Sequence, residues 1–402
     1  MKQTDTLKAL IEELKELEGH RRNQAIKDAW CSAEADRMPR GRRIPRVSGE
    51  GETIPFTEEL EPDMWNRIFR FSVKDFFTDA HCYLENVLRM MIYRFKEFQD
   101  FSPLDTTIPM WFAAVFESSL FGAEPVFKED QCPWVAREPI IKNEADLLRL
   151  PLPDFYRSGL MPLMHRMYEE LGELAGDDLD ISLPQWFRSP FGLATHLHGL
   201  EHTLTDLILN PQFAHRLMRF LTDARKQWVS ERARFLGSSI EPGVLSNDEV
   251  NTPSLSPQLY EDFVLPYERE LCQFHGRIVY WHSCGNTSGL ARSIAKIPVL
   301  DLFHIGPWTD LDKARKAMMP NTAFEKCLMP TTDVYFANPD AMAHQLDQIR
   351  SSLDGSAYTV RADAFQVVGN LEENLAKVKQ WCRVAREKLH NEAWETGCAA
   401  AR

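Results

Sequence analysis

The sequence contains no long hydrophobic run. No window approaches the roughly 20 consecutive apolar residues that a membrane-spanning helix needs. The opening stretch, MKQTDTLKALIEELKELEG, also lacks the uninterrupted apolar core of a secretory signal. We therefore expect a cytoplasmic protein that has no membrane partner.

The sequence also has few cysteines for a disulfide-rich protein and fewer basic than acidic residues. Eight cysteines are scattered at irregular spacing through 402 residues, which is far from the dense pattern of a disulfide-stapled secreted domain. The 46 Lys and Arg residues are outnumbered by 59 Asp and Glu, giving a net charge of -13, so the chain is poorly suited to gripping nucleic-acid phosphates. The 44% hydrophobic content predicts a sizeable globular core.

Two nucleotide-binding motifs are missing as well, because no GxGxxG follows the first candidate strand and the chain has no P-loop. What the sequence does contain is an alternation of short apolar runs with amphipathic helices, which is typical of a parallel sheet. The candidate strands are 108–115, 179–183, 243–246, 277–281, 299–303, 322–324 and 358–360. We therefore predict an α/β fold. Seven strands fit a (β/α)8 TIM barrel with one strand missed better than they fit an open sheet.

The segment before these strands has a different pattern. Residues 1–30 carry Leu and Ile at helical spacing, and residues 63–98 form a second helical region with an apolar face. We expect residues 1–100 to be an N-terminal helical extension and residues 101–402 to be the barrel. The amphipathic extension also suits contact with a second copy of the chain in a homodimer. The basic run 37–46, broken by prolines and glycine, is interpreted as a solvated linker or an anion site.

Chemically reactive side chains follow the predicted strands. Active sites of parallel barrels lie at the carboxyl ends of the strands, so these residues are the candidates for function. We assign catalytic roles to Asp248, Glu249, His304, Arg361 and Asp363, and substrate contacts to Trp186, Arg188, Trp281 and Trp308. The carboxylates would handle protons, and the aromatic and arginine side chains would hold a flat or anionic small molecule.

The sharpest motif is His282-Ser283-Cys284, which leaves the strand 277–281. Side chains at positions i and i+2 of an extended chain share a face, so an imidazole and a thiolate can reach one metal ion. Zinc takes such nitrogen and sulfur ligands. Cys327, at the end of a later strand, is the expected third ligand, and Asp363 is the competing candidate. The alternative interpretation is that these cysteines are small buried hydrophobes.

At this point the chain resembles the uroporphyrinogen decarboxylase superfamily, in particular its cobalamin-dependent zinc methyltransferase branch. The resemblance spans about 77–385 and is carried by Leu120-Phe121-Gly122-Ala123-Glu124, Ser189-Pro190-Phe191-Gly192, Leu255-Ser256-Pro257 and, above all, His282-Ser283-Cys284-Gly285-Asn286. It implies a (β/α)8 barrel, a zinc ion held by His282 and Cys284, and methyl transfer to a corrinoid. The chain has no Asp-x-His-x-x-Gly segment, so the corrinoid would be carried by a partner protein.

The sequence departs from the branch at the last strand, where 359–364 contains no cysteine to serve as the third ligand. A carboxylate in place of a thiolate makes the ion a harder Lewis acid, which favours a methoxylated or otherwise oxygen-bearing small-molecule substrate. The Arg-Gln-Ala-Gly-Arg segment of the decarboxylases is absent. The alternatives are a decarboxylase or lyase of a small carboxylated substrate, with or without metal, and a non-catalytic scaffold protein.

Overall fold

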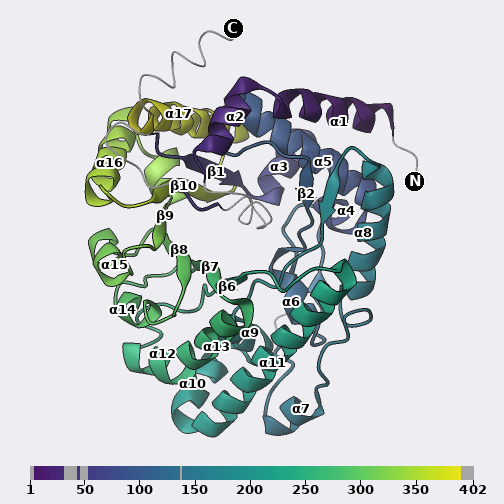
Figure 1. The fold of residues 1–402 in the computed structure, drawn as a ribbon, viewed down its shortest axis with the longest axis vertical. Helices are drawn as coiled ribbons and strands as arrows, with labels where there is room; N and C mark the ends of the chain where they lie inside the picture. The colour runs from purple at the N-terminus through teal and green to yellow at the C-terminus, as the bar shows by residue number, and fades with distance from the viewer. Residues whose placement is uncertain (1–3, 31–42, 46–52, 136–137, 391–402) are drawn as a thin grey trace.

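The computed structural model describes residues 4–30, 43–45, 53–135 and 138–390 (Figure 1). Most of the basic run 37–46 therefore lies outside the described residues. The strands of the described part are β1 (Phe56–Leu60), β2 (Thr107–Pro109), β3 (Pro125–Val126), β4 (Trp134–Val135), β5 (Asp180–Ser182), β6 (Gly243–Ser246), β7 (Ile278–His282), β8 (Leu300–Ile305), β9 (Ala323–Leu328) and β10 (Tyr358–Phe365). Seven of them overlap the seven strands predicted from the sequence, although the strand predicted over 108–115 ends at Pro109 and is followed by a helical turn over Ala113–Val115.

Helices fill most of the connections between these strands. The α-helices are α1 (Asp5–Glu18), α2 (Arg21–Asp28), α3 (Pro62–Phe69), α4 (Val73–Thr78), α5 (Ala80–Tyr93), α6 (Phe116–Ser119), α7 (Glu144–Arg149), α8 (Met161–Ala175), α9 (Pro190–His198), α10 (Leu200–Leu209), α11 (Pro211–Leu236), α12 (Pro257–Phe263), α13 (Leu265–His275), α14 (Ala291–Ile294), α15 (Leu311–Ala317), α16 (Pro339–Ser352) and α17 (Leu371–Leu389). Shorter or wider turns form η3 (Arg94–Phe98), η4 (Ala113–Val115) and η5 (Pro330–Tyr335). Among the described helices, none has both the length and the apolar character needed to cross a bilayer.

The N-terminal helix forms as its sequence pattern predicts. Thr4 caps α1 by accepting a hydrogen bond from the backbone N–H of Leu7. Leu7, Ile11 and Leu14 repeat at helical spacing and are buried, and α1 packs on α5. The polar face of α1 stays exposed, so this helix covers one side of the molecule rather than entering its core.

Six strands form one curved parallel sheet in the order β1-β10-β9-β8-β7-β6. Figure 1 shows these strands as an arc, with α12 to α17 along its outer side. Parallel strands need helical crossovers, and the helices between β6 and β10 supply them. The prediction of an α/β fold with a parallel sheet is confirmed.

A second parallel pair, β2 and β5, forms a separate two-stranded sheet. One isolated parallel bridge, between Arg188 and Ser246, links the chain after β5 to β6. Among the described residues, however, β1 and β2 are not paired with each other. The hydrogen bonds of the described strands therefore form a six-stranded sheet and a separate pair, and they do not close an eight-stranded ring.

Strand β1 lies in the segment that we predicted to be a helical extension. It pairs in parallel with β10, with Phe56 opposite Val360, so this segment contributes a strand to the main sheet. The sequence FTEEL does not show the apolar run of a buried strand, because Glu58 is polar. The Glu58 side chain is nevertheless buried beside Arg94 (Glu58 Oε1 to Arg94 Nε, 2.7 Å). Within the segment that we predicted as a helical extension, Phe56–Leu60 is therefore a strand of the main sheet.

The inner face of the sheet changes character along the strands. A small apolar cluster contains Val244, Tyr280, Leu302 and Ala323, which come from four neighbouring strands. Two residues further along β7, β8 and β9, on the same face, come the polar side chains His282, His304 and Glu325. The inner apolar cluster thus supports a layer of titratable groups at the carboxyl ends of the strands.

A buried carboxyl outside this layer gives the fold a pH dependence. Glu268 of α13 accepts hydrogen bonds from Tyr260, Trp281 and Asn247, the last at 2.8 Å. Burial disfavours the carboxylate more than these donors favour it, and raises its pKa from 4.5 to about 7. The folded state therefore binds this proton more tightly than the unfolded chain does, so its stabilising effect is complete below pH 4.5 and is lost as the pH rises through 7.

We expect Glu268→Gln to flatten this dependence. Between pH 5 and 8 the free energy of unfolding of the wild type should fall relative to that of Glu268→Gln by about 3 kcal/mol, since each pKa unit corresponds to about 1.4 kcal/mol. Urea unfolding across this range measures the difference. Parallel stability curves for the two proteins would contradict the assignment.

Candidate metal centre

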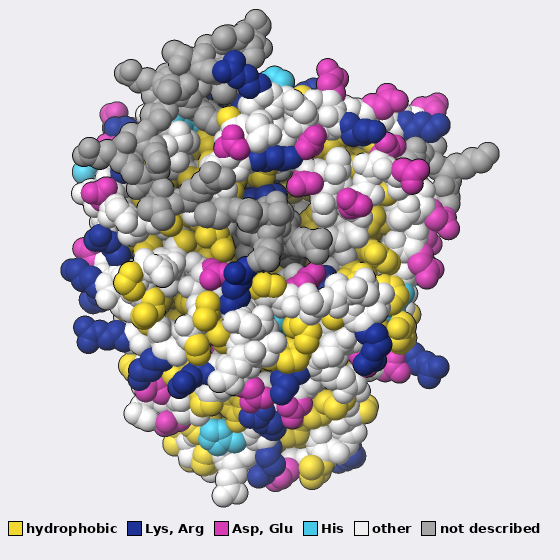
Figure 2. Space-filling model, viewed as in Figure 1, with side chains coloured by type: hydrophobic (Ala, Val, Ile, Leu, Met, Phe, Trp, Pro, Cys, Tyr) yellow, Lys and Arg dark blue, Asp and Glu magenta, His cyan; other side chains and the backbone are white. Residues whose placement is uncertain are grey.

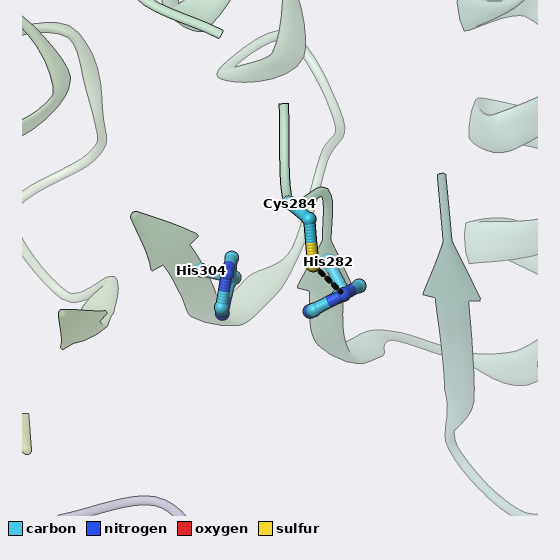
Figure 3. Close-up of side chains that lie close together, drawn as sticks. All are labelled: His282, Cys284 and His304. Carbon is cyan, nitrogen blue, oxygen red and sulfur yellow. Dashed lines mark hydrogen bonds between the residues drawn. The ribbon is translucent and has the colours of Figure 1, made fainter. Parts of the chain in front are cut away.

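Three donor side chains converge at the carboxyl ends of β7 and β8. One donor atom from each of His282, Cys284 and His304 lies within 4.8 Å of the other two. Among the described residues, this is the set of side chains with metal-ligand geometry, and we call it the metal group. The Cys284 Sγ is 3.3 Å from the His282 Nε2. Figure 3 shows His282 and Cys284 rising from the end of β7 and facing His304 on the neighbouring strand.

The strand register explains why these residues meet. Tyr280 lies opposite Leu302 and Trp281 opposite Phe303, so the next residues, His282 and His304, come level at the strand ends. Their rings lie 4.2 Å apart between centroids. The sequence prediction placed His282, Cys284 and His304 at strand ends, and the structure brings the three together.

A tyrosine and a carboxylate behind the histidines determine which ring nitrogens carry protons. The Tyr280 hydroxyl donates to Glu325 Oε1 at 2.5 Å, so its oxygen accepts from His282 Nδ1 at 3.0 Å. Glu325 can only accept as a carboxylate, so His304 Nδ1 donates to it at 2.9 Å. When each ring is neutral, its lone pair is then on Nε2, the arrangement that a metal-binding histidine requires.

The charges around His282 favour a cation. Burial alone would lower the pKa of His282, but the neighbouring Cys284 and Asp248 raise it from 6.5 to about 10. The Asp248 Oδ1 is 3.0 Å from His282 Nε2 and accepts the backbone N–H of Cys284 at 3.3 Å. The proton on His282 balances the negative charges of Cys284 and Asp248. A metal ion bound in its place would balance the same charges. The nitrogen, sulfur and nitrogen donor set fits zinc.

The two predicted third ligands lie beside this group but not in it. Cys327 is buried in β9, two residues beyond Glu325, and burial together with Asp363 and Cys284 raises the pKa of its thiol well above the ordinary value. Asp363 accepts from Arg361 Nε at 3.1 Å and from the backbone N–H of Ala364 at 2.6 Å. The arrangement therefore offers His304 as the third donor in the place that we predicted for Cys327 or Asp363.

Arg361 is held inside the sheet by carboxylates. Its guanidinium contacts Glu59 of β1 and Asp363, and its Nη1 lies 3.9 Å from Glu325 Oε2. The side chain is 1% exposed. Arg361 therefore neutralises the acidic groups behind the metal group. To pair with Arg361, a substrate carboxylate would have to displace one of these acidic side chains.

A cavity of about 170 Å³ opens beside the metal group, and we call it the metal-side cavity. Its polar wall contains His282, Asp248, Arg188 and Gln185, and its apolar wall contains Met110, Trp111, Phe112, Phe116 and Phe187. The side chain of Glu117 anchors this wall by accepting the backbone N–H groups of Phe187 and Arg188. The cavity has the mixture of aromatic surface and few polar groups that is typical of small-molecule sites.

The other predicted site residues occupy different places. Arg188 Nη1 pairs with Glu249 Oε1 at 3.2 Å, and Glu249 also meets His196 Nε2 at 3.3 Å. Arg188 lines the metal-side cavity, whereas Glu249 is not in its lining. The cavity's aromatic lining does not include Trp186 or Trp281, which are buried: Trp186 packs on Trp228, and Trp281 stacks on Phe303. Trp308 is 61% exposed after β8.

Tyr280 and Glu325 are functional candidates that the predicted site residues did not include. The signal for Tyr280 was present, because it precedes His282 by two residues and shares its face of the strand. Glu325 follows an apolar run in the same way as His304. Their role depends on strand register, which places Glu325 opposite His304.

Comparisons with known proteins agree with this architecture. The family model described as uroporphyrinogen decarboxylase (URO-D) matches residues 98–387, well over half of the chain. The structure is similar to that of a methyltransferase from Methanosarcina mazei, with a TM-score of 0.59, 13% sequence identity, and coverage of 83% of this chain and 94% of that chain. No curated protein sequence matches significantly. At this identity, the structural likeness shows the fold.

Proposed function

The chain belongs to the uroporphyrinogen decarboxylase family, and on that premise we propose that it is a zinc-dependent methyltransferase. It would move a methyl group between a small oxygen-bearing substrate and the corrinoid of a partner protein. The observation that carries this proposal is the convergence of His282, Cys284 and His304 beside a cavity. The eight parallel strands would form the (β/α)8 barrel of the family, opened between β1 and β2.

The proposed zinc ligands are His282 Nε2, Cys284 Sγ and His304 Nε2, with Cys327 and Asp363 as the alternatives for the third. Zinc bound there would act as a Lewis acid that makes the substrate oxygen a better leaving group. Three protein ligands would leave one coordination position open for that oxygen. Tyr280 and Glu325 keep both imidazole rings in the ligating tautomer.

The remaining residues handle the substrate and the proton. When the methyl group leaves, the electron pair of the C–O bond stays on oxygen, so the demethylated product must gain a proton. Asp248 lines the metal-side cavity and its side chain is 39% exposed, which suits it to pass this proton in from solvent. Phe112, Phe116 and Phe187 would keep the bound substrate away from bulk water.

The activity test is an incubation of the purified protein with a reduced corrinoid protein and a panel of methyl donors. We expect the cobalt absorbance to change with methoxylated donors in the wild type and not in His282→Ala. The exposed residue His344 lies on α16, so His344→Ala serves as the matched control and should keep wild-type rates. A response to none of the oxygen-bearing donors would contradict the proposed reaction.

The second candidate, a decarboxylase or lyase, is favoured by one observation. Arg188 lines the metal-side cavity and could hold a substrate carboxylate, with Asp248 close by to deliver a proton. Release of CO2 from small carboxylic acids, unchanged after chelator treatment, would favour this reaction over methyl transfer.

A further inference from the structure

The exposed donor of the metal group lies on the loop that follows β7 (Figure 3). Because Cys284 is exposed, packing around its own side chain does not fix the direction of its thiol. Its backbone N–H donates to Asp248 Oδ1 at 3.3 Å, which is long for such a bond. The direction of the Cys284 side chain therefore depends on what holds the backbone of residues 283–287.

Thr309, on the loop that follows β8, binds this backbone at two points. Its hydroxyl donates to the carbonyl of Gly285 at 3.1 Å and accepts the backbone N–H of Thr287 at 2.9 Å. Thr309 is 4% exposed, so water cannot easily take over these two bonds. The Thr309 hydroxyl therefore fixes the main chain immediately after Cys284.

Gly306, the first residue after β8, brings the two loops into backbone contact. A Cβ atom at this position would lie 2.9 Å from the carbonyl oxygen of Cys284 and 3.0 Å from that of Ser283. Both distances are shorter than an ordinary van der Waals contact, and the atoms that a Cβ would meet belong to the backbone. Only glycine allows this approach without displacing Cys284.

Lys326 of β9 in turn holds Gly306. It lies opposite Ile305, and its Nζ donates to the carbonyl of Gly306 at 3.0 Å. The Lys and Arg side chains that Figure 2 shows in dark blue lie on the surface, whereas Lys326 is only 8% exposed. A buried ammonium is costly unless it is hydrogen-bonded, so Lys326 is tied to this carbonyl.

We propose that Thr309 and Lys326 are positioning residues that fix the direction of the Cys284 thiolate. Lys326 holds Gly306, Gly306 supports the carbonyl of Cys284, and Thr309 holds the main chain on the other side of the ligand. Neither side chain belongs to the metal group, so both act through the backbone. This inference rests on the proposed function, because it takes Cys284 as a metal ligand.

Thr309→Val tests the first residue, because it keeps the shape of the side chain and removes the hydroxyl. The carbonyl of Gly285 and the N–H of Thr287 then lose a partner. We expect zinc affinity to fall at least about tenfold, as is usual when a supporting partner is lost. The thiolate-to-cobalt charge-transfer band of the cobalt-substituted protein should also shift. Thr309→Ser keeps the hydroxyl and should stay within about threefold of the wild-type affinity, with the wild-type band.

The matched control is Thr222→Val on α11. Thr222 is 0% exposed, and its hydroxyl donates to the carbonyl of Met218 at 2.7 Å. The same chemical change is thus made at a buried threonine of another element. Thr222→Val should leave the cobalt band and the zinc affinity of the wild type, since a general loss of stability does not reorient a ligand.

Lys326→Met gives an independent variant, because it keeps the length of the side chain and removes the ammonium. It should lower zinc affinity and shift the cobalt band in the same way as Thr309→Val. Lys377→Met is its control, because Lys377 also donates to a backbone carbonyl, that of Ala337 at 2.8 Å, and should change neither quantity. Unchanged bands in folded Thr309→Val and Lys326→Met proteins would overturn the inference. If Thr309→Val does not fold, Lys326→Met decides.

A metal-free measurement separates this inference from the proposed function. In chelator-treated protein, amide hydrogen exchange over 283–287 should be at least about tenfold faster in Thr309→Val and Lys326→Met than in the wild type. Faster exchange in a protein whose wild type binds neither zinc nor cobalt would contradict the proposed function and leave the backbone restraint supported. Wild-type exchange over this segment in both variants would overturn the inference alone.

Discussion

Cys284→Ser is expected to lower zinc affinity by more than about 100-fold, because a neutral hydroxyl is a far weaker ligand than a thiolate. Replacing a residue that only supports a metal ligand typically lowers metal affinity about 10–100-fold, so losing a ligand itself should lower it at least as much. Cys284 is the exposed member of the group and lies 3.3 Å from His282 Nε2, so its loss leaves two imidazoles and removes one negative charge. Competition with a chromogenic chelator measures this affinity.

The matched control is Cys82→Ser, because Cys82 is a half-buried thiol on α5, remote in sequence from the metal group. It should bind zinc like the wild type. Zinc should also slow alkylation of the exposed Cys284 by iodoacetamide, because a metal-bound thiolate is a poorer nucleophile. Equal zinc affinity in Cys284→Ser and the wild type would remove this residue from the ligand set.

Glu325→Gln is the second change with a large expected effect. Glu325 binds Tyr280 at 2.5 Å and His304 at 2.9 Å, and through Tyr280 it also orients His282. The amide keeps the size of the side chain but removes the charge that holds both imidazole rings with their protons on Nδ1. We expect zinc affinity to fall about 10–100-fold, which is the usual effect of losing such a partner.

Two further variants distinguish positioning from general destabilisation. Tyr280→Phe removes only the hydroxyl that links Glu325 to His282, so it should cost part of the same affinity. Glu16→Gln makes the same chemical change as Glu325→Gln at an exposed position on α1 and should have no effect. The d–d spectrum of the cobalt-substituted protein should shift in Glu325→Gln. An unchanged spectrum and affinity would make Glu325 a structural residue only.

The strand positions and the His282–Cys284 pair could be predicted from the sequence because both depend on local patterns. Alternation along a strand puts residues two apart on one face, and buried parallel strands have apolar runs. The same rule indicates that Trp281, adjacent to His282, faces the other way. The structure places it there, stacked on Phe303. Applying the rule to Trp281 would have removed it from the predicted substrate site.

The third donor could not be predicted from the sequence because it depends on how neighbouring strands are staggered. Cys327 has the better ligand chemistry, but it lies opposite Arg361, two residues beyond Glu325. His304 comes level with His282 through the register of β7 and β8. Stagger is a property of the closed or curved sheet as a whole, and no local pattern encodes it.

Strand β1 was missed for a related reason. Its polar residues are buried because partners from distant parts of the chain neutralise them, as Arg94 does for Glu58 and Arg361 does for Glu59. Such pairing over long sequence separations leaves no periodic signal. The cavity lined by residues of both β1 and β2, which depends on where these two strands lie, was consequently beyond sequence analysis.

The most direct test of the metal centre is X-ray absorption at the zinc edge on protein purified without chelator. We expect about one zinc per chain, with one sulfur ligand at about 2.3 Å and nitrogen or oxygen ligands at about 2.0–2.1 Å. Two sulfur ligands would contradict the assignment of His304 as the third donor and would favour Cys327. Protein with less than about 0.2 zinc per chain, even after incubation with excess zinc, would contradict the metal centre itself.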